Sequence, residues 1–173
     1  MDRAIVHQAA GGVAIFIRED VYSEEYQLQT DLEAIAVRIP LPVMTTICSL
    51  YLPPGQTIEE RKLQQLIRQL PQPFLVLGDF NAHDPTWGDL KSDPRGKMTL
   101  GLLNQLNVCL LNTGESTHFS IAHGTHSSID LSVCSPALMP HLRWDVHQDL
   151  CDSDHYLINI TVLNQEPAVS PRR

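Results

Sequence analysis

The chain has 173 residues, which is enough for one domain with a substantial core. Its 43% hydrophobic and 18% charged residues are typical of a globular protein and exclude a disordered one. The formal net charge of −8 argues against a stand-alone protein that binds nucleic acid mainly through phosphate contacts. Such an acidic chain binds something else, needs cations in its site, or borrows positive charge from an attached domain.

No segment approaches the roughly 18 apolar residues that a membrane span needs. The run from Ala9 to Ile17 is a poor signal peptide, because Asp2 precedes it and two glycines interrupt it. The four cysteines are scattered, and Cys48, Cys109 and Cys134 sit in or beside strand-like runs. We therefore expect reduced thiols in an intracellular protein; disulfides in an extracellular protein are the alternative.

The first third of the chain predicts strands and then a helix. Residues 13–17 form a continuous apolar run, as in a buried strand, and residues 33–39 and 43–52 predict a hairpin. Residues 57–60 (Thr-Ile-Glu-Glu) have the pattern of a capping box. Apolar residues then recur at helical spacing until Pro71, where we expect the helix to end.

A buried strand over residues 74–77 leads directly into polar residues. Gly78 allows a sharp exit, and Asp79 and Asn81 follow. Two positions apart in an extended segment, they share one face, where their oxygens suit a hard cation or a phosphoryl group. A loop-capping pair is the alternative, and His83 is predicted to be an ordinary loop residue.

The second half of the chain predicts one helix and several short strands. The expected helix covers residues 97–106, and the expected strands cover residues 108–111, 117–120, 129–133, 144–146 and 156–162. Residues 129–133 alternate, as in a half-buried strand with Asp130 on its polar face. We therefore expect an α/β (α+β) fold, with two packed, mostly antiparallel β-sheets flanked by helices over residues 1–163. Residues 164–173 are predicted to be a polar linker or disordered tail.

Two later strand ends also carry candidate site residues. Asp154 and His155 stand at the start of the last strand, and a carboxylate from another strand would orient His155 and support its charged form. Asp130 is the candidate partner; ordinary surface polarity is the alternative. Tyr51 ends a strand before a proline turn, where its phenol either donates to a phosphate oxygen or packs at a sheet edge.

Two further groups of residues give weaker indications of function. His118, His123 and His126 lack a matching Cys or carboxylate spacing, so the sequence gives little support for a structural zinc site there. Trp87, in the loop after Asn81, stacks on a base or covers the core, and the core is favoured.

Four motifs in this order resemble the endonuclease/exonuclease/phosphatase superfamily, whose fold is shared by deoxyribonuclease I and the apurinic/apyrimidinic endonucleases. They are Tyr51-x-Pro-Pro, Gly78-Asp79-Phe80-Asn81-Ala82-His83, Ser128-Ile129-Asp130-Leu131 and Ser153-Asp154-His155. Other segments are similar to the endonuclease domain of non-LTR retrotransposons of arthropod type. They are Gly11-Gly12-Val13-Ala14-Ile15, Arg95-Gly96-Lys97 with Leu100, Leu111-Asn112-Thr113-Gly114 and Trp144-x-Val146.

The resemblance implies a four-layer sandwich and a DNA-nicking phosphodiester hydrolase. It implies that Asp79 activates the attacking water or protonates the leaving oxygen, and that Asn81 positions phosphate and nucleophile. It also implies that His155, oriented by Asp130, stabilises charge on the scissile phosphate, while Tyr51 contacts a phosphate oxygen.

The implied cofactor is Mg²⁺ or Mn²⁺, held by Asp154 together with Asp79 and Asn81. The implied substrate is DNA, the implied location is the nucleus, and the implied state is a monomer. A reverse transcriptase domain would follow in the parent polyprotein.

The resemblance has one departure. Superfamily members begin with a strand that bears an asparagine and continue to a strand that ends in the glutamate metal ligand, whereas this sequence enters the pattern at Gly11-Gly12. We therefore expect an N-terminally truncated domain that lacks the first strands, with uncovered apolar surface and poor or no DNA hydrolysis. The alternatives are a catalytically inactive remnant with at most an interaction role, or a superfamily member that acts on RNA, a phospholipid or an inositol phosphate.

Overall fold

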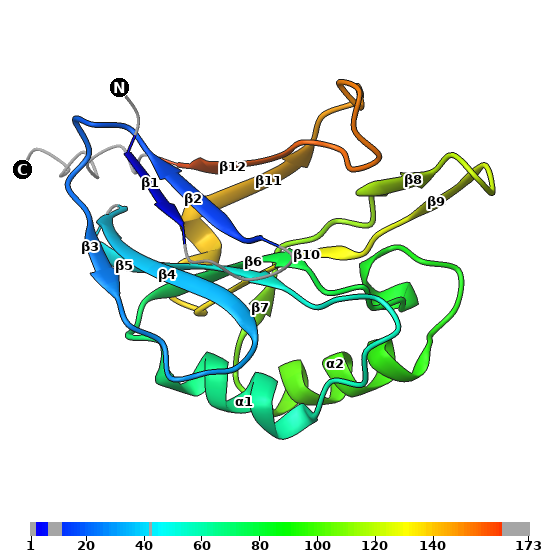
Figure 1. The fold of residues 1–173 in the computed structure, drawn as a ribbon, viewed down its shortest axis with the longest axis horizontal. Coiled ribbons are helices and arrows are strands. Elements are labelled where there is room, and N and C mark those ends of the chain that lie inside the picture. The colour runs from blue at the N-terminus through cyan, green and yellow to red at the C-terminus, as the bar shows by residue number, and fades with distance from the viewer. Residues whose placement is uncertain (1–2, 7–11, 42, 164–173) are drawn as a thin grey trace, which may run out of the picture.

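A six-stranded sheet forms the centre of the computed structural model, which describes residues 3–6, 12–41 and 43–163 (Figure 1). Neighbouring strands are antiparallel except β5 and β6, which are parallel and joined through helix α1 (Glu60–Gln69). In spatial order the strands are β3 (Glu24–Tyr26), β4 (Glu33–Pro40), β5 (Met44–Tyr51), β6 (Phe74–Asp79), β10 (Asp130–Cys134) and β7 (Cys109–Leu110). The expected tail, residues 164–173, lies outside the described residues.

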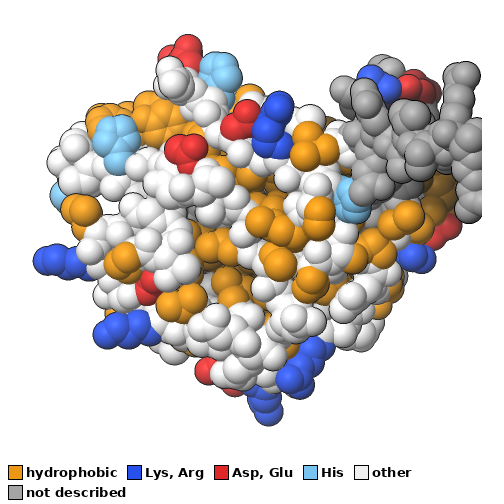
Figure 2. Space-filling model, turned by 180° about the vertical axis from the view of Figure 1, so that it is seen from behind, with side chains coloured by type: hydrophobic (Ala, Val, Ile, Leu, Met, Phe, Trp, Pro, Cys, Tyr) orange, Lys and Arg blue, Asp and Glu red, His pale blue; other side chains and the backbone are white. Residues whose placement is uncertain are grey.

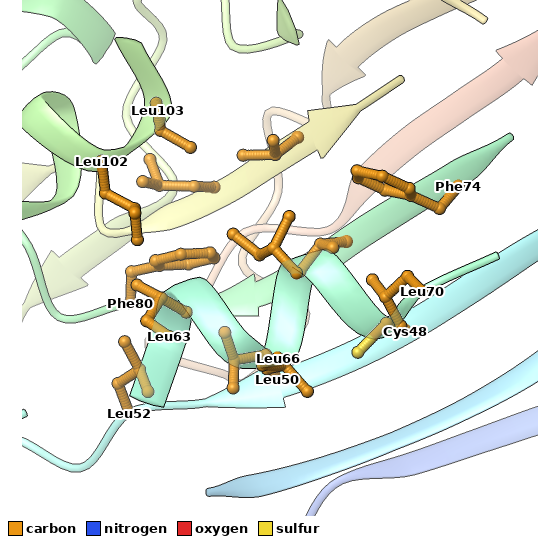
Figure 3. Packing of buried hydrophobic residues seen from close by; sticks show 14 of the residues in the cluster. Cys48, Leu50, Leu52, Leu63, Leu66, Leu70, Phe74, Phe80, Leu102 and Leu103 are labelled. Carbon is orange, nitrogen blue, oxygen red and sulfur yellow. The ribbon is translucent and has the colours of Figure 1, made fainter. Parts of the chain in front are cut away.

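Both long helices, α1 and α2 (Pro94–Gln105), cover one face of this sheet (Figure 1). Side chains alternate along β5 and β6, so that Leu50 and Val76 face the helices. Figure 3 shows Leu63 of α1 and Leu102 of α2 in this core, and both are fully buried. Each fully buried side chain of this size contributes about 1.5–3 kcal/mol, so this layer contributes strongly to the stability of the fold.

The described chain has three further two-stranded pairs, of which the first two lie on the opposite face of the main sheet and the third lies beyond its end (Figure 1). They are β1 (Arg3–Val6) with β2 (Ala14–Ile17), β11 (Leu142–Val146) with β12 (Ile158–Val162), and β8 (His118–Ser120) with β9 (Thr125–Ser127). The helices, the main sheet and these hairpins supply three of the four layers expected from the sequence. In the described part of the chain, the second sheet is thus divided into pairs of strands.

An apolar groove of about 540 Å³ runs between the main sheet and the β1–β2 and β11–β12 hairpins. Its lining includes Ile15, Val37, Ile47, Leu77 and Ile160. Most of the residues that line this groove are apolar. Figure 2 shows hydrophobic side chains near the middle of one face, with Lys and Arg scattered around its rim rather than gathered into a stripe.

Three local expectations from the sequence were wrong. The cap of α1 is Glu59, which makes no side-chain capping bond, so residues 57–60 are not a capping box. Helix α2 begins at Pro94, because the Asp93 carboxylate accepts from the Gly96 N–H and caps it there. Strand β10 is buried on both faces beyond Asp130, because the β11–β12 hairpin covers the face expected to be exposed.

Three strands of the described chain were not predicted. β1 pairs with β2 upstream of Gly11-Gly12, β3 pairs with β4 and forms one edge of the main sheet, and β9 pairs with β8. The sequence of β3, Glu-Glu-Tyr, has no apolar alternation to reveal it.

Other expectations were confirmed. Trp87 is fully buried and donates its indole N–H to the Ala82 carbonyl at 3.0 Å. All four cysteines are free thiols, and Cys48 and Cys134 are buried. No described helix is long and apolar enough to cross a membrane.

Gly78 allows β5 and β6 to approach closely, and we expect Gly78→Ala to destabilise the fold strongly. A Cβ at this position would lie 1.7 Å from the Leu50 carbonyl oxygen, which belongs to the rigid backbone of the neighbouring strand. The expected loss is about 3 kcal/mol or more in free energy of unfolding, measured with urea. The control is Gly101→Ala in α2, where a Cβ meets nothing within 4 Å and should stabilise by about 0.5–1 kcal/mol. Equal stability of Gly78→Ala and wild type would contradict this close packing.

Candidate active site

Four polar residues lie in one row across the main sheet, at the same end of four adjacent strands. Glu33 pairs with Tyr51, Tyr51 pairs with Asp79, and Asp79 pairs with Asp130. Leu50, Phe80 and Leu131, which are adjacent to these residues in the sequence, pack toward the helices. Because side chains alternate along a strand, the row faces the hairpin side of the sheet.

Asp130 and His155 form the pair predicted from the sequence. The His155 Nδ1–H donates to Asp130 Oδ2 at 2.9 Å, inside the 2.6–3.2 Å range of a strong hydrogen bond. Two hydrogen bonds to Thr117 hold this geometry. The Asp130 backbone N–H donates to Thr117 Oγ1 at 3.0 Å, and the Tyr156 N–H donates to the Thr117 carbonyl at 2.8 Å. Thr117 is buried and was missed by sequence reasoning.

Asp79 and Asn81 contact each other directly where β6 ends. Asp79 Oδ1 accepts from the Asn81 backbone N–H at 2.8 Å, and Oδ2 accepts from Asn81 Nδ2 at 2.7 Å. Asn81 takes a positive φ of 46°, a conformation that asparagine tolerates better than most residues. Its amide also donates to the Leu52 carbonyl at 3.1 Å, so Nδ2 is engaged and Oδ1 is the atom left for a cation. The same contacts satisfy the loop-capping alternative.

Two titratable groups of the site, Asp79 and His155, have pKa values that are shifted from their usual ranges. Burial raises the pKa of Asp79 to about 6, and the neighbouring Asp130 charge adds to the effect. The hydrogen bond to Asp130 raises the pKa of His155, with the charges of Asp130, Asp79 and Asp154 acting in the same direction. A carboxyl group poised near neutrality beside a stabilised imidazolium suits acid–base chemistry on an anionic substrate.

Tyr51 and Asp154 lie at the edges of the cluster. Tyr51 shares the row with Asp79 and also lines a small cavity of about 110 Å³ with Glu33 and Pro53. Asp154 is exposed and lies 4.0 Å from His118 Nε2. Asp154 therefore lies beside His118, and its described ion pair is with this histidine.

His118 belongs to the rim of the site, although sequence reasoning grouped it with His123 and His126. It forms an isolated β-bridge with His155, and the two rings are tilted by 59° with their centroids 4.8 Å apart. Burial lowers the pKa of His118, and the nearby charge of His155 lowers it further. The pairing of β8 with the segment at residue 155 is a long-range contact with no local sequence signal.

Arg95 joins the two loops that leave β5 and β6. Its guanidinium donates to the carbonyl oxygens of Leu52 at 3.1 Å, Phe80 at 3.1 Å and Pro53 at 2.8 Å, and also to that of Gln56. These carbonyls flank Tyr51 on one side and Asn81 on the other. Arg95 therefore positions the site without lying in it; its signal in the sequence was the Arg95-Gly96-Lys97 motif.

We expect Arg95→Lys to lower the free energy of unfolding by about 2 kcal/mol, because an ammonium cannot reproduce the planar fork and leaves carbonyls unpaired. Thermal unfolding measures this loss. Arg61→Lys is the matched control, since Arg61 is 73% exposed and pairs only with Glu59 at 3.6 Å among the recorded ion pairs. A melting temperature unchanged in Arg95→Lys would show that the four contacts are dispensable.

The oxygen atoms present fit a hard divalent cation. Asp79 and Asn81 meet at the end of β6 and offer carboxylate and amide oxygens, which are the ligands that Mg²⁺ and Mn²⁺ prefer. Asp154, beside His118, offers a further carboxylate. The raised pKa of Asp79 reflects a buried negative charge beside Asp130, and a cation would relieve it.

A central sheet with helices on one face, β-hairpins on the other and an Asp–His pair at one edge defines a domain of the endonuclease/exonuclease/phosphatase class. The endonuclease domain of TRAS1, a telomere-specific non-LTR retrotransposon, superposes with a TM-score of 0.82 and 28% identity, over 95% of this chain and 80% of that domain. The sequence pattern of the Endonuclease-reverse transcriptase family matches residues 45–159. The chain belongs to this family.

Two curated relatives come from Drosophila melanogaster. The probable RNA-directed DNA polymerase from transposon BS is 30% identical over 95% of this chain, and the RNA-directed DNA polymerase from mobile element jockey is 31% identical over 94%. The chain spans 18% of the length of each.

Proposed function

We propose that this domain nicks DNA by metal-dependent hydrolysis of a phosphodiester bond. The observation that carries the proposal is the Asp130–His155 hydrogen bond of 2.9 Å beside Asp79, a carboxyl group whose pKa is raised to about 6. Membership of the family and the likeness to the TRAS1 endonuclease domain support DNA as the substrate.

In this proposal Asp79 handles the proton. Its ionised carboxylate takes a proton from the water that attacks phosphorus, or its acid form gives a proton to the leaving oxygen. Asn81 holds Asp79 through two hydrogen bonds and so fixes the direction of that transfer. A pKa near 6 places the group close to the pH at which it works, as acid–base catalysis requires.

His155 stabilises the charge on the phosphate. Asp130 holds Nδ1, so Nε2 is left to donate to a non-bridging oxygen, and the same hydrogen bond favours the charged ring. Tyr51, in the same row as Asp79, donates to a second phosphate oxygen. Preorganised donors of this kind lose no energy to reorientation during the reaction.

Asp79, Asn81 and Asp154 would hold Mg²⁺ or Mn²⁺. The ion would supply charge neutralisation at the phosphate, which an acidic domain with a formal net charge of −8 needs. With the ion bound, the acidic chain would bind the phosphates of DNA despite its own negative charge.

We further propose that the 173-residue chain, assayed alone, nicks slowly. The row of polar residues at the end of the main sheet contains one glutamate, Glu33, but strand β5 separates it from Asp79, so it does not take the place of the glutamate expected from the superfamily pattern. Mg²⁺ is usually held by one or two carboxylates, so the loss of one weakens the site. The parent protein would carry a reverse transcriptase, and the nick would serve it as a primer in the nucleus.

A substrate panel tests the proposal against its alternatives. The protein is incubated with supercoiled plasmid, single-stranded RNA and soluble inositol phosphates, each with Mg²⁺, with Mn²⁺ and with EDTA. We expect conversion of plasmid to the open circle that EDTA abolishes. Cleavage of RNA or release of inorganic phosphate, with the plasmid uncut, would assign the domain to another substrate class. No reaction with any of the substrates would favour the inactive remnant.

A further inference from the structure

A second set of donor atoms lies on the rim of the site, where β8 meets the segment around residue 155. It consists of His118, Asp154 and His155, each of which places one donor atom within 4.8 Å of the others. The backbone fixes this meeting, because the Phe119 N–H donates to the Asp154 carbonyl at 2.8 Å and His118 bridges His155. The three residues are therefore brought together by the fold itself.

Each imidazole ring is held by a hydrogen bond at Nδ1. His118 Nδ1 is hydrogen-bonded with Ser127 Oγ at 3.0 Å, and His155 Nδ1 with Asp130 Oδ2 at 2.9 Å. Each ring therefore has Nε2 free, and His118 Nε2 lies 4.0 Å from Asp154 Oδ2. Histidines that bind metals almost always have their second nitrogen fixed by such a hydrogen bond. Both rings meet this requirement before any ion arrives.

From this geometry we infer that His118, Asp154 and His155 bind Zn²⁺ or a similar transition-metal ion. Two nitrogens and one carboxylate oxygen suit this class of ion, whereas Mg²⁺ selects oxygen ligands. Tetrahedral Zn²⁺ with bonds of about 2.0–2.1 Å needs donors about 3.3 Å apart, so the set has to contract slightly. The Asp154 side chain is 63% exposed and is free to make that movement.

The bound ion would inhibit nicking, and this consequence rests on the proposed function. The proposed function assigns His155 Nε2 to the scissile phosphate and Asp154 to Mg²⁺. An ion that occupies both withdraws them from catalysis. Binding itself needs no catalytic activity, so the two parts of the inference are separately testable.

Zinc binding is measured by competition with a chromophoric chelator in buffer that contains Mg²⁺. Every protein carries Cys151→Ser, because an exposed thiol can itself bind Zn²⁺ and would obscure the measurement. We expect one Zn²⁺ per chain, and His118→Gln should weaken binding at least ~10-fold. The matched control is His123→Gln in the β8–β9 turn, whose ring contacts Ser120 and should leave affinity unchanged. No zinc uptake, or equal affinity in His118→Gln, would overturn the site.

Two further measurements complete the test. Asp154→Asn should weaken zinc binding as well, and because this residue is exposed, the variant tests the site even where His118→Gln unfolds. Zinc should inhibit plasmid nicking at lower concentrations in the wild type than in His118→Gln. Binding without inhibition would uphold the zinc site and refute the assignment of His155 to the phosphate.

Discussion

Replacement of Asp130 by asparagine should lower the turnover number for DNA nicking by a factor of about 100 or more. Asp130 Oδ2 accepts the only hydrogen bond recorded for His155 Nδ1 in the described part of the chain, at 2.9 Å. Asparagine keeps the size of the side chain but removes the charge that favours the imidazolium, and it can present an N–H where an acceptor is needed. The ring then loses both its orientation and its positive charge.

The pH dependence provides a second readout for the same variant. The pKa of His155 is raised in the wild type, chiefly by the hydrogen bond to Asp130, so the charged ring persists above its usual range. Activity that needs this charge falls as pH rises through the raised pKa, and in Asp130→Asn the fall should occur at lower pH. NMR titration of His155 checks the shift without any need for turnover. Asp145→Asn on β11 is the control, since Asp145 is 52% exposed and its ion pair is with Arg143.

An unchanged His155 titration in Asp130→Asn would show that the carboxylate is merely structural. Reduced turnover with an unchanged titration would point instead to loss of the Thr117 contact that holds the Asp130 backbone.

Those parts of the site that depend on the local sequence pattern were predictable. In the sequence, Asp79 and Asn81 follow a continuous apolar run, and Asp130 stands between the apolar residues Ile129 and Leu131, so their positions at strand ends could be inferred. The pairing of His155 with Asp130 followed from the need of a histidine for an orienting carboxylate. These inferences require only the period of a strand and the chemistry of an imidazole.

Long-range contacts that no side-chain chemistry announces were not predictable. His118 meets His155 because β8 pairs with a segment more than thirty residues away, and nothing local in either segment encodes that contact. The four carbonyls that Arg95 joins lie on two loops, and hydrogen bonds to backbone leave no mark on the partner residues' identity. The division of the second sheet into hairpins likewise depends on which strands meet in space.

The start of helix α1 was mispredicted for a different reason. Thr57 and Glu60 have the spacing of a capping box, but the chain around them follows Pro53-Pro54-Gly55 in an extended path, and the helix begins only at Glu60. The conformation of the loop before α1 therefore determines where the helix begins, and the capping-box pattern of residues 57–60 does not.

Asp79→Asn should abolish nicking, with a loss of at least ~1,000-fold, because Asp79 is both the group proposed to move the proton and a proposed ligand of the metal. Asparagine neither accepts a proton from water nor supplies the negative charge that a divalent cation needs. Asp20→Asn is the matched control, because Asp20 is exposed and contacts Arg18 on the surface. Both variants are first shown to fold by their unfolding transitions.

The most direct test of the account is the rate at which supercoiled plasmid becomes the open circle, measured with enzyme in excess and Mg²⁺ present. Enzyme excess makes even slow nicking by the 173-residue chain measurable. The account predicts slow nicking by the wild type and by Asp20→Asn, none above background by Asp79→Asn, and none in EDTA. Equal rates in Asp79→Asn and wild type, or nicking that persists in EDTA, would contradict a metal-dependent centre built around Asp79.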